Sequence, residues 1–129
     1  MSQEFLTEII SPEKVFYKSK TLEATIPSSE GAVGILYDHI PIITFLRPGI
    51  IILRTSKGEE SFFVEDGVVE FKNNTLNILS NSAVNVIDLK KNIIDELIKN
   101  SNKILSQENL SDKEIFIHSH KIDILKQIS

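Results

Sequence analysis

Cysteine and tryptophan are absent from the 129-residue chain, and it contains no long run of apolar residues. Without cysteine the chain forms no disulfide, no thiolate metal site and no cysteine nucleophile, which suits a reducing cytosol. The longest apolar clusters, such as residues 49–53, are far below the about 18 residues of a membrane-spanning helix. The first eight residues carry acids where a secretory signal has a basic region. These absences predict a protein that does not insert into a membrane by itself.

Basic residues are too few for a general nucleic-acid binder, because 14 Lys and Arg stand against 18 Asp and Glu. The net charge of −4 therefore predicts no nucleic-acid partner. Residues 1–88 carry 7 Lys and Arg against 12 Asp and Glu (net −5), and residues 89–129 carry 7 against 6 (net +1). No Pro follows Pro48 and no Gly follows Gly67, so the last third has no helix breaker. We expect two domains, residues 1–88 and 89–129.

The first domain consists of short strand signals separated by turns. Residues 21–26 alternate apolar and polar side chains, which is typical of a half-buried strand, and Pro27 is expected to end it. Residues 40–46 are apolar, but Pro41 argues against a central strand there. The expected strands are residues 5–10, 15–17, 21–26, 33–36, 50–55, 61–64, 68–71, 75–79 and 82–87. Many short strands at near-regular spacing predict a mainly β sandwich or barrel.

The second domain has helical periodicity. Apolar residues fall at positions 89, 93, 94, 97, 98, 104 and 105, with Ser101 as a polar gap in the stripe. Ser111 and Glu114 match a capping box, which predicts a second helix that starts there and runs to about Lys126. Ile115, Ile122 and Leu125 are expected on one face of it. A short polar link between the two helices predicts an antiparallel α-helical hairpin.

No residue pattern in the chain predicts an active site. His39 follows an aspartate, but neighbours in sequence rarely point at one another, and a polar contact at a packed turn or an interface is expected instead. His118 and His120 point apart in the predicted helix, and no third ligand accompanies them, so no metal site is expected. The Gly-x-x-Gly of residues 31–34 lacks the Lys-Ser/Thr ending of a phosphate loop. We therefore expect no enzyme activity and no cofactor.

Adjacent acids, such as Glu65 and Asp66, are expected in solvated turns because nothing in the sequence makes them converge. Two kinds of function remain open on the residues alone. One is a docking subunit that uses the turn-rich segment between residues 30 and 49. The alternative is a free-standing β-sandwich module that binds a ligand such as carbohydrate, although nine aromatic residues without tryptophan offer little platform for a sugar.

Residues 30–49 carry a specific resemblance. Their Gly, His and Pro positions follow the pattern E-G-x-x-G-I-L-x-x-H-x-P-L-I-x-x-L-x-P-G of the epsilon subunit of bacterial F-type ATP synthase, the delta subunit of mitochondrial nomenclature. Ser11-Pro12-Glu13 and the segment from Gly67 to Glu70 resemble flanking features of the family. The resemblance covers residues 3–88 well, and beyond them it rests on length and the helical hairpin pattern.

The resemblance implies a non-catalytic rotor subunit that couples the gamma subunit to the ring of c subunits during proton-driven ATP synthesis. It implies a peripheral location on the cytoplasmic face of the inner membrane, through the ATP synthase complex. The expected partner-binding residues are Glu30, Gly31 and Ala32 in the loop facing the c ring, and His39 and Pro41 near gamma. These turns are expected at one end of the sandwich.

For the tail, the resemblance implies a hairpin that either folds on the sandwich or extends toward the alpha/beta hexamer and inhibits ATP hydrolysis. Lys113, Lys121 and Lys126 are the candidate contacts of the extended tail. Some relatives bind ATP through an Ile/Leu-Asp-x-x-Arg-Ala motif near the second helix, which this chain lacks, and no Arg follows Arg54. We therefore expect weak or no ATP binding by the isolated subunit. Ala32 stands where many relatives carry an acid, so the contact with the ring is expected to differ there.

Overall fold

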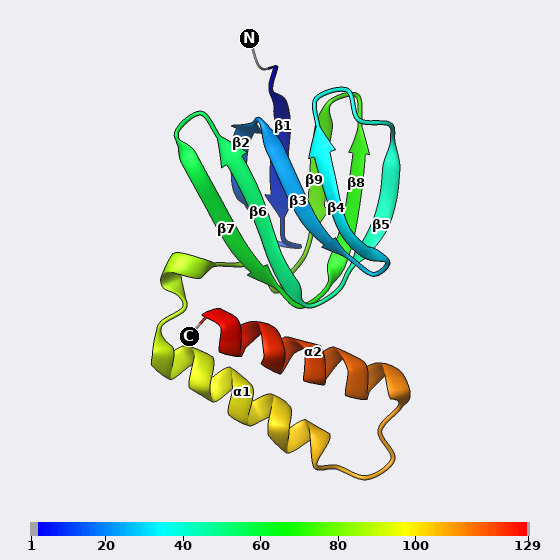
Figure 1. Ribbon diagram of the computed structural model, residues 1–129, viewed down its shortest axis with the longest axis vertical. Coiled ribbons are helices and arrows are strands. Elements are labelled where there is room, and N and C mark those ends of the chain that lie inside the picture. The colour runs from blue at the N-terminus through cyan, green and yellow to red at the C-terminus, as the bar shows by residue number, and fades with distance from the viewer. Residues whose placement is uncertain (1–2, 129) are drawn as a thin grey trace.

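The computed structural model describes residues 3–128 and consists of a curled β-sheet with two helices beneath one end of it (Figure 1). The strands are β1 (Phe5–Ile10), β2 (Val15–Thr21), β3 (Glu23–Ser28), β4 (Gly31–Leu36), β5 (Ile42–Leu46), β6 (Gly49–Thr55), β7 (Gly58–Val64), β8 (Gly67–Lys72), β9 (Thr75–Leu79) and β10 (Val84–Asn85). A short 3-10 helix (Val86–Asp88) leads to α1 (Lys91–Leu105) and α2 (Asp112–Ile128). The predicted β domain and helical hairpin are confirmed.

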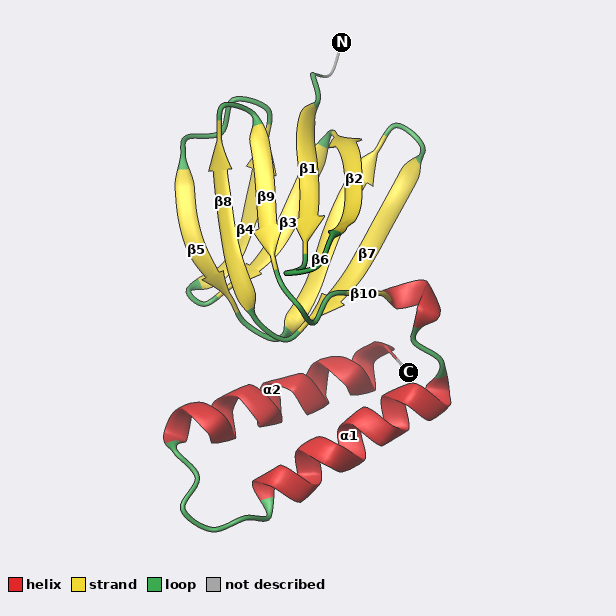
Figure 2. Ribbon diagram, turned by 180° about the vertical axis from the view of Figure 1, so that it is seen from behind, coloured by secondary structure: helices red, strands yellow, loops and turns green. Residues whose placement is uncertain are grey.

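The ten strands form one sheet in the order β10-β7-β6-β3-β5-β8-β9-β1-β2, with β4 paired to β3. Its strand pairs are antiparallel, except that β1 and β9 run parallel. Seen from behind, the sheet curls so that its two halves face each other (Figure 2). This curl allows one face of every long strand to close around a shared core.

The sandwich core follows from the period-two alternation of the strands. In β1, for example, Phe5, Thr7 and Ile9 are buried and the residues between them are half-buried. Phe5 packs edge-on against Phe71 of β8, with ring centroids 5.4 Å apart. Thr7 is one of the few polar residues inside, and its hydroxyl is 2.7 Å from that of Thr21, so the two satisfy each other.

A second apolar cluster joins the helices to the end of the sandwich. Its buried members are Phe63 at the end of β7, Leu89 before α1, Ile94 in α1 and Leu125 in α2. Burial of an amphipathic face is what stabilises helices as short as these. The hairpin is therefore docked on the sandwich. None of the helices between residues 3 and 128 is long and apolar enough to cross a membrane.

The capping box predicted at Ser111 is confirmed. The backbone N–H of Glu114 donates to Ser111 Oγ over 3.1 Å, and the N–H of Ser111 donates to Glu114 Oε1 over 3.3 Å. The predicted apolar face of α2 is partly wrong. Ile122 and Leu125 are 7% and 0% exposed, but Ile115 is 44% exposed because the first turn of α2 lies beyond the buried cluster.

Three strand predictions also need correction. Residues 42–46 do form a strand inside the sheet, because Pro41 precedes the first ladder residue, Ile42, which pairs with Phe71. Pro27 does not end β3, whose pairing with β4 continues to Ser28. Residues 15–17 are only the start of β2, which continues to residue 21.

The last predicted strand, residues 82–87, is much shorter in the structure. Only Val84 and Asn85 pair, with Phe63 and Phe62 of β7. The Asn85 side chain accepts a hydrogen bond from the N–H of Ile87 over 3.0 Å and starts the 3-10 helix instead. A local side-chain bond to the backbone competes here with the β-ladder.

Candidate functional site

The β3–β4 turn presents the first group of predicted partner-binding residues. Ser28 is buried, and its hydroxyl donates to the carbonyl of Gly31 over 2.6 Å while it accepts from the N–H of Glu30 over 3.2 Å. Gly31 has φ of +128°, which L side chains rarely adopt, so the tight turn favours glycine there. Glu30 and Ala32 are exposed. The turn thus holds one carboxylate and one methyl group outward on a rigid backbone.

The β4–β5 loop presents the second group. Asp38 accepts a hydrogen bond on Oδ1 from the amide of Asn74 over 2.8 Å, and its own N–H donates to Asn74 Oδ1 over 2.7 Å. His39 donates from Nδ1 to the carbonyl of Ile40, 2.6 Å away, and its ring packs edge-on against Phe71. Asp38 therefore orients the loop and not the histidine. His39 thus makes a polar contact at a packed turn, and Pro41 is exposed two residues later.

The two groups lie at opposite ends of the sandwich, so the expectation that these turns share one end is wrong. The β3–β4 turn is beside the helices, and the loop with His39 is at the far end (Figure 1). The reason is that β4 alone separates them, and a six-residue strand spans about 20 Å. Any single strand sends the turns before and after it to opposite ends.

Exposed apolar side chains gather in the segment that joins and follows these turns. Leu36, Ile40, Ile43 and Phe45 are 52%, 75%, 70% and 66% exposed. We call residues 36–45 the docking segment. Single exposed apolar residues are normal on a protein surface, but Ile43 and Phe45 point to the same face of β5, and such neighbouring large residues are a candidate interaction surface. Of this segment, only His39 and Pro41 are predicted from the sequence to bind a partner. The outward-facing positions of β5 were missed because its strand was not predicted.

The tail lysines are engaged within the docked hairpin. Lys121 is 9% exposed and forms an ion pair with Glu65, which follows β7. Lys113 contributes to the wall of a groove between α2 and the sandwich. Lys126 also interacts within the chain. Glu65 lies in a partly solvated turn, as expected, but the expectation missed its partner, because tertiary packing brings a buried ammonium group against its carboxylate.

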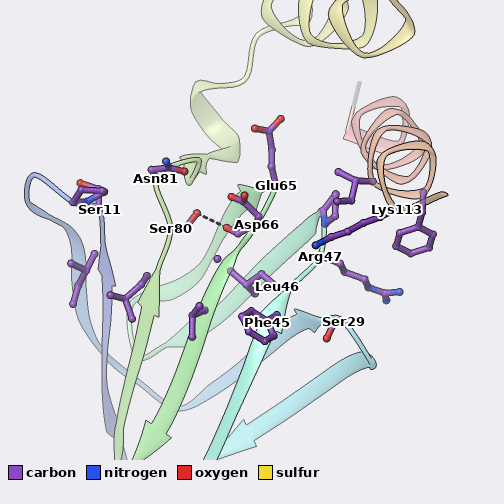
Figure 3. Close-up of a pocket in the computed structure, with 18 residues that line it drawn as sticks. Ser11, Ser29, Phe45, Leu46, Arg47, Glu65, Asp66, Ser80, Asn81 and Lys113 are labelled. Carbon is purple, nitrogen blue, oxygen red and sulfur yellow. Dashed lines mark hydrogen bonds between the residues drawn. The ribbon is translucent and has the colours of Figure 1, made fainter. Parts of the chain in front are cut away.

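The groove has a volume of about 820 Å³ and runs between the first half of α2 and the strand ends (Figure 3). Its apolar walls include Phe45 and Leu46 on one side and Phe116 on the helix. Its charges are mixed, since Arg47 and Lys113 face the same space as two acids. This mixture favours no ligand of one charge sign.

The two histidines of α2 do not converge on a metal site. His118 Nδ1 is 3.3 Å from the hydroxyl of Ser101, which is buried in α1, and so links the two helices. His120 stacks on Phe116 with ring centroids 5.2 Å apart. Across residues 3–128, no three His, Asp or Glu side chains are grouped as metal ligands. Ser101, expected only as a gap in the apolar stripe, thus has a structural partner.

Comparison with known proteins shows which family shares this sequence and architecture. Residues 4–86 match the family model of the ATP synthase delta/epsilon chain, beta-sandwich domain. The ATP synthase epsilon chain of Pelagibacter ubique is 43% identical, and the match covers 100% of both chains. The epsilon chain of Brucella canis is 31% identical, over 92% of this chain and 91% of that one. The family match ends at residue 86, just before the helical tail begins.

Solved structures share the fold. A chain of the Euglena gracilis mitochondrial ATP synthase (OSCP/F1/c-ring) superposes with a TM-score of 0.74 at 13% identity, covering 95% of this chain and 78% of that chain. A chain of the central stalk and c-ring of the Tetrahymena thermophila mitochondrial ATP synthase gives a TM-score of 0.67 at 13% identity, covering 98% and 96%. The carbohydrate-binding alternative is not favoured by these findings. The chain belongs to the ATP synthase delta/epsilon chain family and is a non-catalytic rotor subunit of F-type ATP synthase.

Proposed function

We propose that the chain docks through its β domain on the gamma subunit and on the ring of c subunits, and so couples the two during proton-driven ATP synthesis. The observation that carries this proposal is the docking segment, with four large apolar side chains at least half exposed. Burying such side chains gives about 25 cal/mol for each Å² removed from water, which is the main driving force for stable association. The docking segment is our candidate for the gamma contact.

The c ring would then meet the β3–β4 turn, at the end of the sandwich away from His39. Glu30, Gly31 and Ala32 form the turn there, and the hydrogen bonds of Ser28 keep it rigid. A rigid turn loses little conformational entropy on binding. Because Ala32 carries no charge, we propose that Glu30 supplies the polar contact with the ring and that Ala32 packs against it. Contacts of one stiff sheet with both partners allow torque to pass between them.

The division at residues 88–89 into a docking domain and a tail is part of the same proposal. We propose that the tail undocks and extends toward the alpha/beta hexamer, where it restrains ATP hydrolysis. Lys121 is bound to Glu65 in the docked hairpin, so it would meet the hexamer only after release. We also propose that the subunit is peripheral, at the cytoplasmic face of the inner membrane, through these partners.

The gamma contact is tested by co-purification with the gamma subunit of the same cell. Replacing two outward residues of β5 together (Ile43→Ser and Phe45→Ser) removes exposed apolar area without opening the core, so the variant stays folded and loses gamma. The matched control is Val15→Ser, which removes a 52% exposed apolar side chain from β2. Retention of gamma by the double variant at the level of the control would contradict the proposed contact.

A further inference from the structure

The hairpin and the sandwich are joined by the ion pair of Lys121 and Glu65, beside the apolar cluster. Lys121 lies in the middle of α2, and Glu65 directly follows β7, so the pair bridges the two parts of the chain. Apolar burial holds the parts together without a preferred direction, whereas an ion pair needs two side chains in one geometry. We propose that this pair is a latch that keeps the hairpin docked and whose opening frees Lys121. The inference concerns the chain alone and does not depend on its partners.

The backbone that carries Glu65 is held in place by the sandwich itself. The N–H of Glu65 donates to Ser82 Oγ over 3.0 Å, and the Ser80 hydroxyl donates to the carbonyl of Asp66 over 2.8 Å. Figure 3 shows the bond between Ser80 and Asp66. The hydroxyls of Ser80 and Ser82 are 3.0 Å apart, and this network ties the β7–β8 turn to the segment after β9. These four residues all belong to the sandwich and its turns. The turn that carries the receiving carboxylate is therefore held without any contact from the hairpin.

The two halves of the latch differ in their contact with water. The Lys121 side chain is 11% exposed, and its neighbours Ile122 and Leu125 in α2 are buried. The Glu65 side chain is 36% exposed and keeps part of its hydration. A lysine ammonium this deeply buried requires a partner, whereas a carboxylate at the surface does not. Loss of the carboxylate should therefore favour release of the hairpin more strongly than loss of the ammonium.

This asymmetry distinguishes a latch from an incidental surface pair. Glu65→Gln removes the charge and keeps the side-chain shape and the backbone bond to Ser82, but it leaves the Lys121 ammonium buried without its counter-charge. Lys121→Met keeps an unbranched apolar chain in the buried position and leaves Glu65 solvated. Combining the two removes both charges, so no buried charge is left without its counter-charge.

Release of the hairpin can be measured by thiol labelling, because the chain has no cysteine of its own. Leu125→Cys places a single thiol at a fully buried position of α2 in the full-length chain. Its labelling rate reports the equilibrium for opening when reclosing is fast. A second reporter, Val69→Cys, lies in the sandwich core, where the residue is 1% exposed, and reports opening of the sandwich.

We expect Glu65→Gln to raise the labelling rate of the Leu125 reporter by about tenfold, the effect of one buried charge left unpaired. Lys121→Met should raise it by less than about threefold, and the double variant should fall below Glu65→Gln. The Val69 reporter should stay unchanged in all of them. Glu59→Gln, which removes the same charge from the exposed start of β7, and Lys99→Met on the exposed face of α1 are the matched controls.

Three results would each overturn the latch. The first is a Leu125 labelling rate in Glu65→Gln equal to that of the Glu59 control. The second is a larger effect of Lys121→Met than of Glu65→Gln, which would mean that the lysine stem and not its charge pairing holds the hairpin. The third is an equal rise of the Val69 reporter, which would place the effect in the sandwich.

Discussion

Gly67, at the start of β8, is the position where the backbone is least tolerant of a side chain. Its φ is +149°, outside the range that L residues readily adopt. A Cβ added there would lie 2.4 Å from the carbonyl oxygen of Leu79, 3.0 Å from Leu46 Cδ1 and 3.1 Å from Ser80 Cβ. The closest atom belongs to the backbone and cannot rotate away. Gly67→Ala should therefore strain the turn that carries Glu65.

The magnitude follows from comparison with two other glycines. Gly31 has φ of +128° and open space where a Cβ would lie, so Gly31→Ala carries backbone strain alone, about 1–2 kcal/mol. Gly34 has open space and an ordinary φ, so Gly34→Ala should stabilise the strand by about 0.5–1 kcal/mol. Gly67→Ala adds about 1–3 kcal/mol of overpacking to the strain, for a total of about 2–5 kcal/mol.

The assay is thermal and urea unfolding of the three variants beside the unaltered chain. For a chain of this length 1 kcal/mol corresponds to about 4 °C in Tm, so Gly67→Ala should lower Tm by about 8–20 °C. Gly31→Ala should lower it by about 4–8 °C, and Gly34→Ala should raise it slightly. If Gly67→Ala and Gly31→Ala lower the free energy of unfolding equally, the close approach to Leu79 carries no energy and the reasoning fails.

Three further predictions concern the tail. Ser111→Ala removes the cap of α2 and should destabilise the docked hairpin by about 1 kcal/mol in circular dichroism melts. Ser119→Ala, on the exposed surface of the same helix, should not destabilise it. Equal melting temperatures of the two variants would rule out the cap contribution. Removing residues 89–129 should raise ATP hydrolysis by the reconstituted complex, and unchanged hydrolysis would exclude the inhibitory tail. Calorimetry of the isolated chain should detect no ATP binding, and saturable micromolar binding would refute that prediction.

The family and the elements were accessible from the sequence because their signals are local. The alternation of residues 21–26, the turn dipeptides and the capping box at Ser111 each depend on a few neighbouring residues and on their own backbone chemistry. The Gly and Pro positions between residues 30 and 49 are also local signals, because each restricts or frees its own backbone. The strand predictions were wrong where a local rule did not apply at one position. Pro41 lies just before β5 and does not interrupt it, and the Asn85 side chain ends β10 by binding the backbone of Ile87.

The sequence by itself determined a β domain, a helical hairpin and a family pattern without an active site. Only the tertiary structure decided that Glu30 and His39 lie at opposite ends, that the docking segment exposes Ile43 and Phe45, and that Glu65 meets Lys121. The physical reason is that strand curl and helix docking bring together residues far apart in the chain. Their pairing depends on which surfaces remain to be buried, and no local pattern records that choice.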